Sequence, residues 1–258
     1  MSALAHPPVV LCLSGHDPCG GAGLQADIEA IRAQGVHPAT VVTALTVQDS
    51  RNAYAVEAID CRVVIENAQL MLEDLPVAVI KLGLLGSAEN AQGIAALLER
   101  HAGLPVVLDP VLRAGGGAAL ADQALIDAIA HALLPHTTVL TPNLVEARLL
   151  AHPAREREAC AQSLLKRGVQ HVLITGGDEP AGDEVLNTLH SATGVTSWRW
   201  PRLPQRYHGS GCTLAASLAA RLALGEALPQ AVETAQRYTW HSLRDAYRVG
   251  RGQYFPKR

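Results

Sequence analysis

Lysine is scarce in this chain of 258 residues. Only Lys81, Lys166 and Lys257 occur among the 21 basic residues, and none of them follows a glycine. A Walker A loop needs Gly-Lys-Ser/Thr to hold nucleotide phosphates. The sequence therefore excludes a P-loop nucleotide hydrolase.

The chain also has few features of secreted, membrane or nucleic-acid-binding proteins. Its five cysteines form no Cys-x-x-Cys pair, which indicates reduced thiols and no zinc site. Aromatic residues make up 3% and the net charge is -3, which leaves little for stacking on bases or binding phosphate backbones. The first basic residue is Arg32, and the longest apolar runs are far too short to cross a membrane. We expect a cytoplasmic protein with neither nucleic-acid nor membrane partners.

Short apolar runs and segments of helical period alternate along the chain. The apolar runs predict strands at residues 9–13, 40–47, 55–59, 77–82, 106–108, 138–140 and 172–174, with an antiparallel hairpin within 184–200. The helical periodicity predicts helices at 23–33, 63–75, 213–224 and 229–247. No repeat or linker interrupts this pattern, so we predict a single domain over residues 1–258. It should be a three-layer α/β/α fold with a mostly parallel sheet and ligands at the carboxyl ends of the strands.

The most informative segment is His208-Gly209-Ser210-Gly211-Cys212-Thr213, just ahead of a run of small residues. Glycines at a helix start expose backbone N–H groups at the positive end of the helix dipole, which makes an anion hole. The same dipole favours a thiolate, so Cys212 is a candidate base or nucleophile. A tight turn with a buried cysteine explains the pattern equally well.

A second glycine-rich segment, residues 14–23, follows the first strand and opens the first helix. Gly21-x-Gly23-x-x-Ala26, with Asp49 beyond it, fits the dinucleotide fingerprint of an NAD-dependent oxidoreductase. Seven residues separate Leu13 from Gly21, however, so the tight turn that the fingerprint needs is missing. Asp27 is expected on the polar side of the first helix, where a solvated acid is the usual interpretation.

Acidic and amide side chains follow two later strands, and a glycine turn follows a third. Asp109 ends the run at 106–108, and Asn143 and Glu146 follow the run at 138–140 with a spacing of three residues. Such groups can hold a hydrated Mg²⁺, although for each residue taken singly a turn before proline or a helix capping box is the more common explanation. Thr175-Gly176-Gly177 follows the next strand and could admit a phosphate chain.

In this order, the segments resemble the hydroxymethylpyrimidine/phosphomethylpyrimidine kinases of thiamine biosynthesis, a ribokinase-like branch. The matching stretches lie at residues 15–27, 43–48, 81–85, 108–111, 141–147 and 208–213. The resemblance implies a ribokinase-like fold and phosphorylation, by ATP and Mg²⁺, of 4-amino-5-hydroxymethyl-2-methylpyrimidine and then of its monophosphate. It also implies a homodimer.

The resemblance assigns roles to individual residues. Pyrimidine contacts fall to Gly15, Asp27, Gln48 and Leu84, and the anion hole to Gly209, Ser210 and Gly211, with Cys212 as catalytic base. The nucleotide side comprises Asn143, Glu146, Thr175 and Gly177, and the metal ligands are Asp109 and Glu146.

The sequence departs from the family where phosphates need neutralising. Thr175 stands where members often have lysine, and the stretch after Asp109 also lacks one, which leaves Arg113 as a candidate replacement. A pyridoxal kinase remains an alternative because that branch shares the cysteine-type motif. A catalytically silent ligand-binding protein of the same fold is the alternative from another class.

Overall fold

The structure is a computed structural model that describes residues 6–179 and 182–258. The strands are β1 (Val9–His16), β2 (His37–Gln48), β3 (Ala53–Ala58), β4 (Val77–Leu82), β5 (Val106–Leu108), β6 (Val139–Leu140), β7 (His171–Ile174), β8 (Glu184–Ser191) and β9 (Gly194–Pro201). The helices are α1 (Gly23–Ala33), α2 (Cys61–Asp74), α3 (Ala88–Arg100), α4 (Gln123–Ala128), α5 (Leu144–Leu150), α6 (Arg157–Lys166), α7 (Ser210–Ala223) and α8 (Leu228–Arg244), with short π and 3-10 turns, η1 (Ile129–Leu133) and η2 (Leu134–His136), after α4.

The described strands form one sheet in the order β3-β2-β1-β4-β5-β6-β7-β8-β9. The pairings from β2 to β7 are parallel, whereas β3 at one edge and β8 with β9 at the other are antiparallel. The predicted parallel core and the hairpin within 184–200 are therefore confirmed. One boundary differs from the prediction: α7 begins at Ser210 rather than at residue 213. Cys212 therefore lies inside the first turn of the helix.

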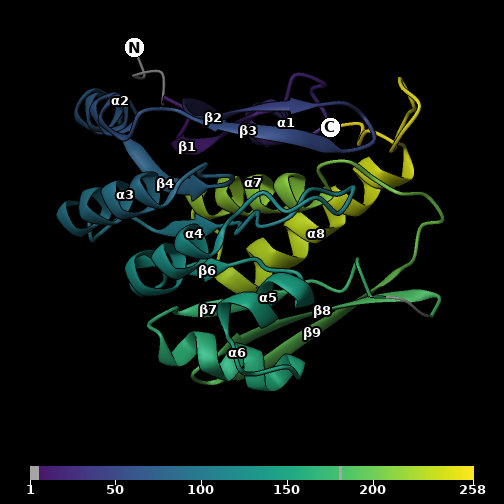
Figure 1. Ribbon diagram of the computed structural model, residues 1–258. Coiled ribbons are helices and arrows are strands. Elements are labelled where there is room, and N and C mark those ends of the chain that lie inside the picture. The colour runs from purple at the N-terminus through teal and green to yellow at the C-terminus, as the bar shows by residue number, and fades with distance from the viewer. Residues whose placement is uncertain (1–5, 180–181) are drawn as a thin grey trace, which may run out of the picture.

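Helices cover both faces of the sheet, which gives the three predicted layers (Figure 1). One buried cluster joins the sheet to α2, α3, α4, α5 and α6, and the other joins it to α1, α7 and α8. Residues of β1 alternate between the clusters: Leu11 and Leu13 enter the first, whereas Val10 and Cys12 enter the second. This alternation follows from the two-residue period of a strand that is buried on both faces.

Helix α7 lies against the sheet and is buried along most of its length. Ala215, Ala216, Ala219 and Ala220 are fully buried, and a helix that is apolar on all sides is typical of a protein interior. Such small side chains let the helix backbone approach the sheet closely. The packing therefore fixes the amino end of α7, which carries the predicted anion hole.

The parallel strands end at one edge, where the predicted site segments gather. Loops there follow β1, β4, β5, β6 and β7, and α7 begins beside them: a Cβ at Gly211 would lie 3.7 Å from an oxygen of Asp109, just after β5. In the described ranges, no helix has the length and apolar character needed to span a membrane.

Candidate active site

The amino end of α7 has the geometry of an anion hole. Gly209 is the N-cap residue, with φ 76° and ψ 22°, and Thr213 N–H donates to the Gly209 carbonyl at 3.0 Å. The N–H groups of Ser210, Gly211 and Cys212 precede that first intrahelical bond, so the helix itself supplies no acceptor for them. These donors at a positive helix end can bind the oxygens of a phosphoryl group.

The two glycine segments interlock beside this helix end. A Cβ at Gly209 would lie 2.0 Å from the Gly21 carbonyl oxygen, and its φ is one that residues with a side chain rarely adopt. A Cβ at Gly21 would in turn lie 2.2 Å from Cδ2 of His208. Glycine at 209 is thus required twice, by the backbone angle and by the close approach.

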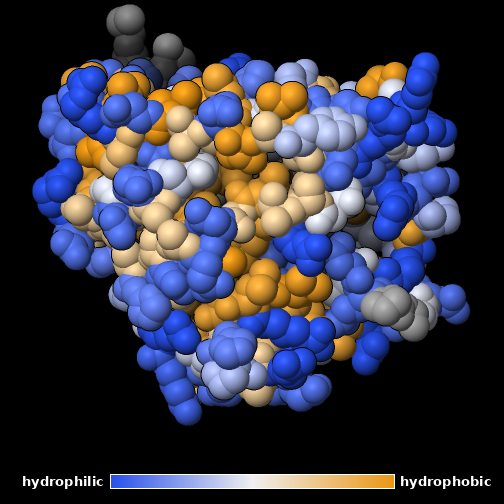
Figure 2. Space-filling view, in the orientation of Figure 1, coloured by the Kyte–Doolittle hydropathy of each residue, from blue (hydrophilic) through white to orange (hydrophobic). Residues whose placement is uncertain are grey.

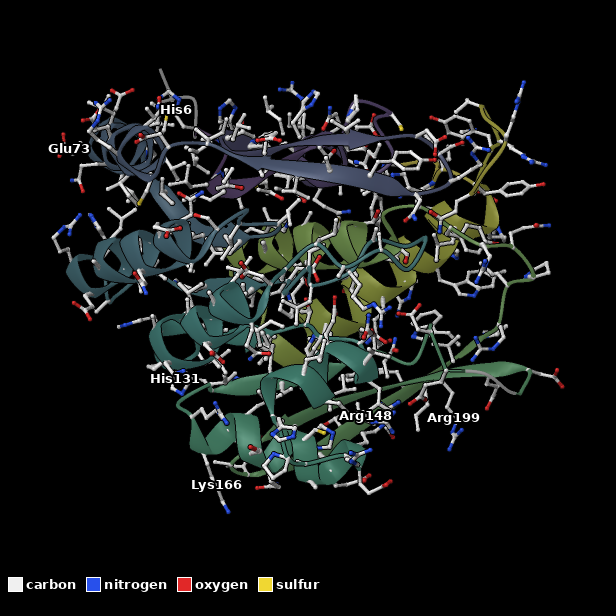
Figure 3. The ribbon with its side chains drawn as sticks, in the orientation of Figure 1. His6, Glu73, His131, Arg148, Lys166 and Arg199 are labelled. Atoms are coloured by element: carbon white, nitrogen blue, oxygen red, sulfur yellow. The ribbon has the colours of Figure 1, made fainter. Side chains whose placement is uncertain are left out.

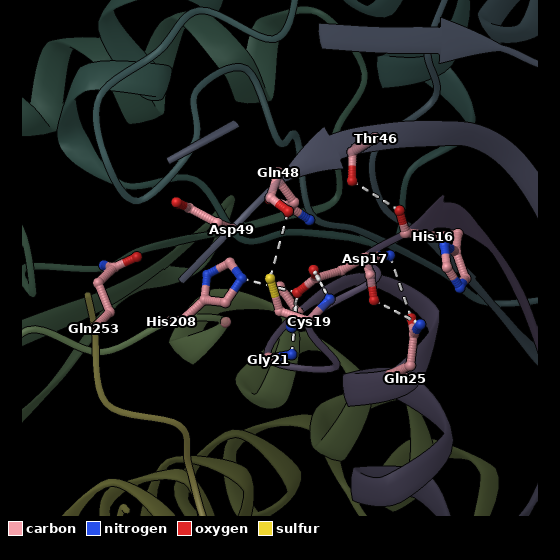
Figure 4. Close-up of polar contacts among 12 residues, drawn as sticks. His16, Asp17, Cys19, Gly21, Gln25, Thr46, Gln48, Asp49, His208 and Gln253 are labelled. Carbon is pink, nitrogen blue, oxygen red and sulfur yellow. Dashed lines mark hydrogen bonds and ion pairs between the residues drawn. The ribbon is translucent and has the colours of Figure 1, made fainter. Parts of the chain in front are cut away.

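Asp17 is the polar centre of the first glycine segment (Figure 4). Its carboxylate accepts from the N–H groups of Cys19 at 2.8 Å, Gly21 at 3.0 Å and Ala22 at 2.8 Å, and Nε2 of His208 lies 2.8 Å away. Burial alone would raise the pKa of Asp17, but the His208 side chain and the loop N–H groups hold it below its usual value. This carboxylate joins the first glycine segment to the residue that precedes the anion hole.

The predicted pyrimidine contacts lie beside the first glycine segment. Gly15 and Leu84 face each other, because a Cβ at Gly15 would lie 2.8 Å from the Leu84 side chain. Gln48 ends β2, and its carbonyl lies 3.7 Å from the thiol of Cys19 (Figure 4). The fold therefore brings Gly15, Leu84 and Gln48 to the carboxyl ends of adjacent strands.

Asp27 corrects the sequence analysis. Both it and Lys81 are fully buried, with the Lys81 ammonium 2.9 Å from the carboxylate, so the solvated interpretation of Asp27 is wrong. Burial raises the pKa of Asp27, and Lys81 lowers it in part. Burial would lower the pKa of Lys81, but the acidic groups around it, Asp27 foremost, together raise that pKa. The reason for the error is that Ala26, Asp27 and Ala30 lie on the sheet-facing side of α1. Contact of Asp27 with a pyrimidine stays a prediction.

Cys212 is a buried thiol close to Asp109. Burial first, and then the Asp109 charge, raise the pKa of Cys212 to about 12, although Lys81 and the Gly23 N–H lower it. Burial thus acts against the thiolate, whereas the helix end favours it, and the role of Cys212 as a base stays a prediction. Burial also raises the pKa of Asp109, to about 6.

Asn143 and Glu146 form the capping box that the sequence analysis kept as an alternative. The Asn143 side chain accepts from Glu146 N–H at 2.9 Å, and Glu146 accepts from Asn143 N–H at 3.1 Å. Glu146 also accepts from Leu112 N–H at 3.3 Å, which ties α5 to the loop after β5. Burial and then the Asp109 charge raise the pKa of Glu146 to about 8, so these two carboxylates lie within electrostatic reach of each other.

The other predicted phosphate contacts lie around the end of β7. Thr175 pairs with Asn143 in a parallel bridge, and a Cβ at Gly177 would meet nothing within 4 Å. Arg113 donates to the Gly117 carbonyl at 2.9 Å within its own loop. Arg202 is another cation at this end, since it donates to the Gly177 carbonyl at 3.1 Å. Lys166 does not supply a cation here, because its side chain points outward at the periphery of the molecule (Figure 3).

The sequence analysis gave no role to Lys81, Asp17, His208 or Arg258. A lysine inside the apolar run of β4 was a signal for a buried ion pair, because an unpaired ammonium there would be strongly destabilising. No local signal identified Arg258, whose contacts all lie far away in the sequence.

The sequence is similar to phosphomethylpyrimidine kinases and to a bifunctional protein of thiamine biosynthesis. It matches the phosphomethylpyrimidine kinase family over residues 17–257. It is 36% identical to a hydroxymethylpyrimidine/phosphomethylpyrimidine kinase of Mycobacterium bovis, over 95% of this chain and 92% of that protein. It is also 36% identical to a thiamine biosynthesis bifunctional protein of Geobacter sulfurreducens, over 94% of this chain, and there it spans half of the relative's length.

Solved structures have the same fold. A pyridoxal kinase from Staphylococcus aureus in complex with pyridoxal superposes with a TM-score of 0.89 at 25% identity, covering 98% of this chain and 94% of that one. A phosphomethylpyrimidine kinase from Clostridium difficile gives 0.78 at 26% identity, covering 91% of this chain and 98% of that one. The predicted ribokinase-like α/β/α fold is confirmed, and the chain belongs to the phosphomethylpyrimidine kinase family.

Proposed function

We propose that this protein transfers the γ-phosphoryl group of ATP to the hydroxymethyl group of 4-amino-5-hydroxymethyl-2-methylpyrimidine, and then phosphorylates the monophosphate to the diphosphate. The observation that carries the proposal is the amino end of α7, where free N–H groups, Cys212 and Asp109 meet. Family membership supports the acceptor, and the ADP and AMP-PCP complexes of related pyridoxal kinases support the nucleotide.

The pyrimidine would lie between Gln48 and the floor made by Gly15 and Leu84. A glutamine amide offers one donor and one acceptor side by side, which matches the edge of an aminopyrimidine. Leu84 supplies an apolar surface for the ring, and glycine at 15 keeps that surface clear. The buried pair of Lys81 and Asp27 lies on the neighbouring elements β4 and α1, and Asp27 would be a further pyrimidine contact.

The nucleotide side fits Mg²⁺. Asp109 and Glu146 are buried carboxylates whose pKa values are raised by burial, so a divalent cation would stabilise their ionised forms. Among the described residues, no group of three or more His, Cys, Asp or Glu side chains could hold a metal alone. Mg²⁺ is commonly held by one or two carboxylates, water and substrate phosphates, so it would arrive with ATP. When bound, it spreads the charge of the transferring group.

Catalysis by this chain consists mainly of positioning and electrostatic stabilisation. The N–H groups of Ser210 and Gly211 would receive the phosphoryl oxygens, and Cys212, after losing its own proton, would take the proton of the acceptor alcohol as a thiolate. Because the Asp109 charge helps to raise the pKa of Cys212, a cation held at Asp109 would lower that pKa and favour the thiolate. The second acceptor is a phosphate monoester with a second pKa of about 6, so it is already largely ionised at neutral pH. The base is needed for the first transfer only.

This division gives a test of Cys212. We expect Cys212→Ala to slow phosphorylation of the alcohol on the order of 100-fold, and that of the monophosphate far less. Cys160→Ala, another buried free thiol, is the matched control and should leave both rates unchanged. Equal losses in the two assays would contradict a role for Cys212 as base.

The function itself is tested by incubating the protein with Mg-ATP and one of three acceptors, and by identifying the products by mass. The acceptors are the hydroxymethylpyrimidine, its monophosphate and pyridoxal. We expect one added phosphate on each pyrimidine compound. Pyridoxal is included because a pyridoxal kinase superposes with a TM-score of 0.89. Phosphorylation of pyridoxal alone would overturn the proposal, and no transfer at all would favour a silent ligand-binding protein.

We also propose a homodimer that works in the cytoplasm. Leu45 and Val47 on β2 and Tyr54 on β3 are about half exposed or more (47%, 59% and 62%), and Figure 2 shows apolar side chains gathered over this region. A second copy of the chain would cover them. We expect light scattering to give a dimer mass, and Leu45→Glu with Val47→Glu to give a monomer. The free thiols of all five cysteines suit a reducing compartment.

A further inference from the structure

Arg258 makes three contacts that converge on the interlocked glycine segments. Its side chain is 1% exposed. One nitrogen, Nε, donates to the hydroxyl of Thr213 at 2.8 Å, and Nη2 donates to the carbonyl of Gly21. The third, Nη1, lies 3.1 Å from Glu29 on α1. The guanidinium therefore joins α1, the first glycine segment and α7.

Through Thr213, these contacts reach the anion hole. The Thr213 hydroxyl accepts from Arg258 and donates to the Gly209 carbonyl at 2.7 Å, so one hydroxyl links the guanidinium to the N-cap of α7. A Cβ at Gly209 would lie 2.9 Å from Nη2 of Arg258. Arg258 thus fills the space beside the residue whose backbone angle sets the direction of the free N–H groups.

The segment that carries Arg258 is itself fixed to the site. Tyr254 accepts from His208 N–H at 2.8 Å, and the Phe255 ring lies 5.6 Å from the His208 ring. Lys257 N–H donates to the Ser242 carbonyl at 2.9 Å. These contacts hold the guanidinium in place, so little freedom remains to be lost when it binds its three partners.

The charge of Arg258 is incompletely neutralised. Among the described residues its one ion-pair partner is Glu29, whose side chain is 54% exposed and therefore screened by water, while the Asp27 charge acts on it without an ion pair. The other two partners are a carbonyl and a hydroxyl. A buried cation beside a positive helix end adds to the field that attracts an anion there. Lysine could not replace it, because an ammonium lacks the planar fork that reaches three separate acceptors.

We propose that Arg258 is a positioning residue for phosphoryl transfer: it locks the Gly21 carbonyl and Thr213 together and thereby fixes the N–H groups at Ser210 and Gly211. It touches neither the acceptor nor ATP. The inference rests on the proposed kinase function for its kinetic effect. Its structural part, the locking of two segments, stands on the contacts alone.

The test compares Arg258→Met with Lys257→Met, a neighbour whose side chain is exposed. Methionine keeps an apolar stem of similar length and removes the charge and the donors. We expect kcat to fall about 10- to 100-fold with the hydroxymethylpyrimidine and with its monophosphate alike, because both transfers use the same N–H groups. The KM for ATP should stay within about threefold, since Arg258 does not contact the nucleotide. Lys257→Met should match the wild type.

Amide hydrogen exchange supplies a readout that does not depend on activity. We expect faster exchange in Arg258→Met at residues 20–23 and 210–213, and no change there in Lys257→Met. Unchanged exchange, or unchanged kcat in folded protein, overturns the proposal. If the wild type transfers no phosphate, the proposed function fails while the exchange result still decides the locking role. Should Arg258→Met not fold, Arg258→Lys is measured in the same way, with a smaller loss expected.

Discussion

The proposed acceptor side and the proposed nucleotide side of this site are built on different physical principles. On the acceptor side, charged groups have partners within the chain: Asp17 has three N–H donors and His208, and Lys81 has Asp27. On the nucleotide side, Asp109 and Glu146 lie buried within each other's electrostatic reach with raised pKa values. On the first side the charged groups have partners of opposite sign, whereas Asp109 and Glu146 form no ion pair among the described residues.

The difference explains how a chain with so few lysines can serve ATP. The acceptor side must be rigid because it selects one small molecule, and rigid placement requires satisfied polar groups. On the nucleotide side the proposed Mg²⁺ would bring positive charge with ATP, which suits a site where the protein supplies carboxylates and N–H groups. The predictions below test this division.

The largest effect is expected where the two sides meet. Gly209→Ala would place a Cβ 2.0 Å from the Gly21 carbonyl and force the N–H groups of α7 out of line. We expect kcat to fall on the order of 100- to 1000-fold, the range seen when a preorganised donor is lost. Gly225→Ala is the control, because Gly225 has a φ of 82° with nothing within 4 Å of its Cβ position. If Gly209→Ala keeps more than a third of the control's activity, the interlock is unimportant.

The next-largest effect is on the free energy of unfolding, which should differ between variants of the two sides. Lys81→Met leaves Asp27 as a buried unpaired carboxylate, and we expect the free energy of unfolding to fall by about 3–5 kcal/mol. Lys81→Met with Asp27→Leu should recover much of it. Asp109→Asn, on the nucleotide side, removes a charge that burial already disfavours, so we expect a change within about 1 kcal/mol. Urea unfolding measures all three, and equal losses for Lys81→Met and Asp109→Asn would contradict the division.

A smaller effect depends on pH. Because the folded pKa of Asp17 lies below its usual value of 3.8, its carboxylate stabilises the protein above that pH, and this contribution is lost as the pH falls through the folded pKa. We expect Asp17→Asn to lower the free energy of unfolding by about 1–3 kcal/mol at pH 7. The difference from wild type should shrink below about pH 4. A difference independent of pH would show that the charge of Asp17 does not matter.

The smallest effect concerns Arg113, the sequence-based candidate for a phosphate contact. Its guanidinium is exposed and bonded to Gly117, so we expect Arg113→Ala to raise the KM for ATP by about threefold. Arg62→Ala, an exposed change on α2, serves as control. An unchanged KM would remove Arg113 from the nucleotide side.

Much of the fold was predictable, because a strand buried on both faces and a helix have distinct periods. The predicted ranges 23–33, 77–82 and 106–108 agree with α1, β4 and β5. The helices α3, α4, α5 and α6 were given no predicted ranges; α4 and α5 are short and carry few repeats of the period. The start of α7 was placed three residues late because glycine has low helix propensity, whereas here Gly211 lies within the first turn.

The sequence by itself determined the fold class, the order of the site segments and the absence of a P-loop, because periodicity and motif spacing are local properties. Only the tertiary structure decided that Asp27 faces inward to Lys81, that burial raises the pKa of the Cys212 thiol, and that Arg258 reaches Gly21. Burial and the distance between charges set these properties, and both depend on residues far apart in the chain. Only in the folded chain is it seen that one of the three lysines, Lys81, is buried against Asp27 and that Asp109 and Glu146 are left to a proposed cation.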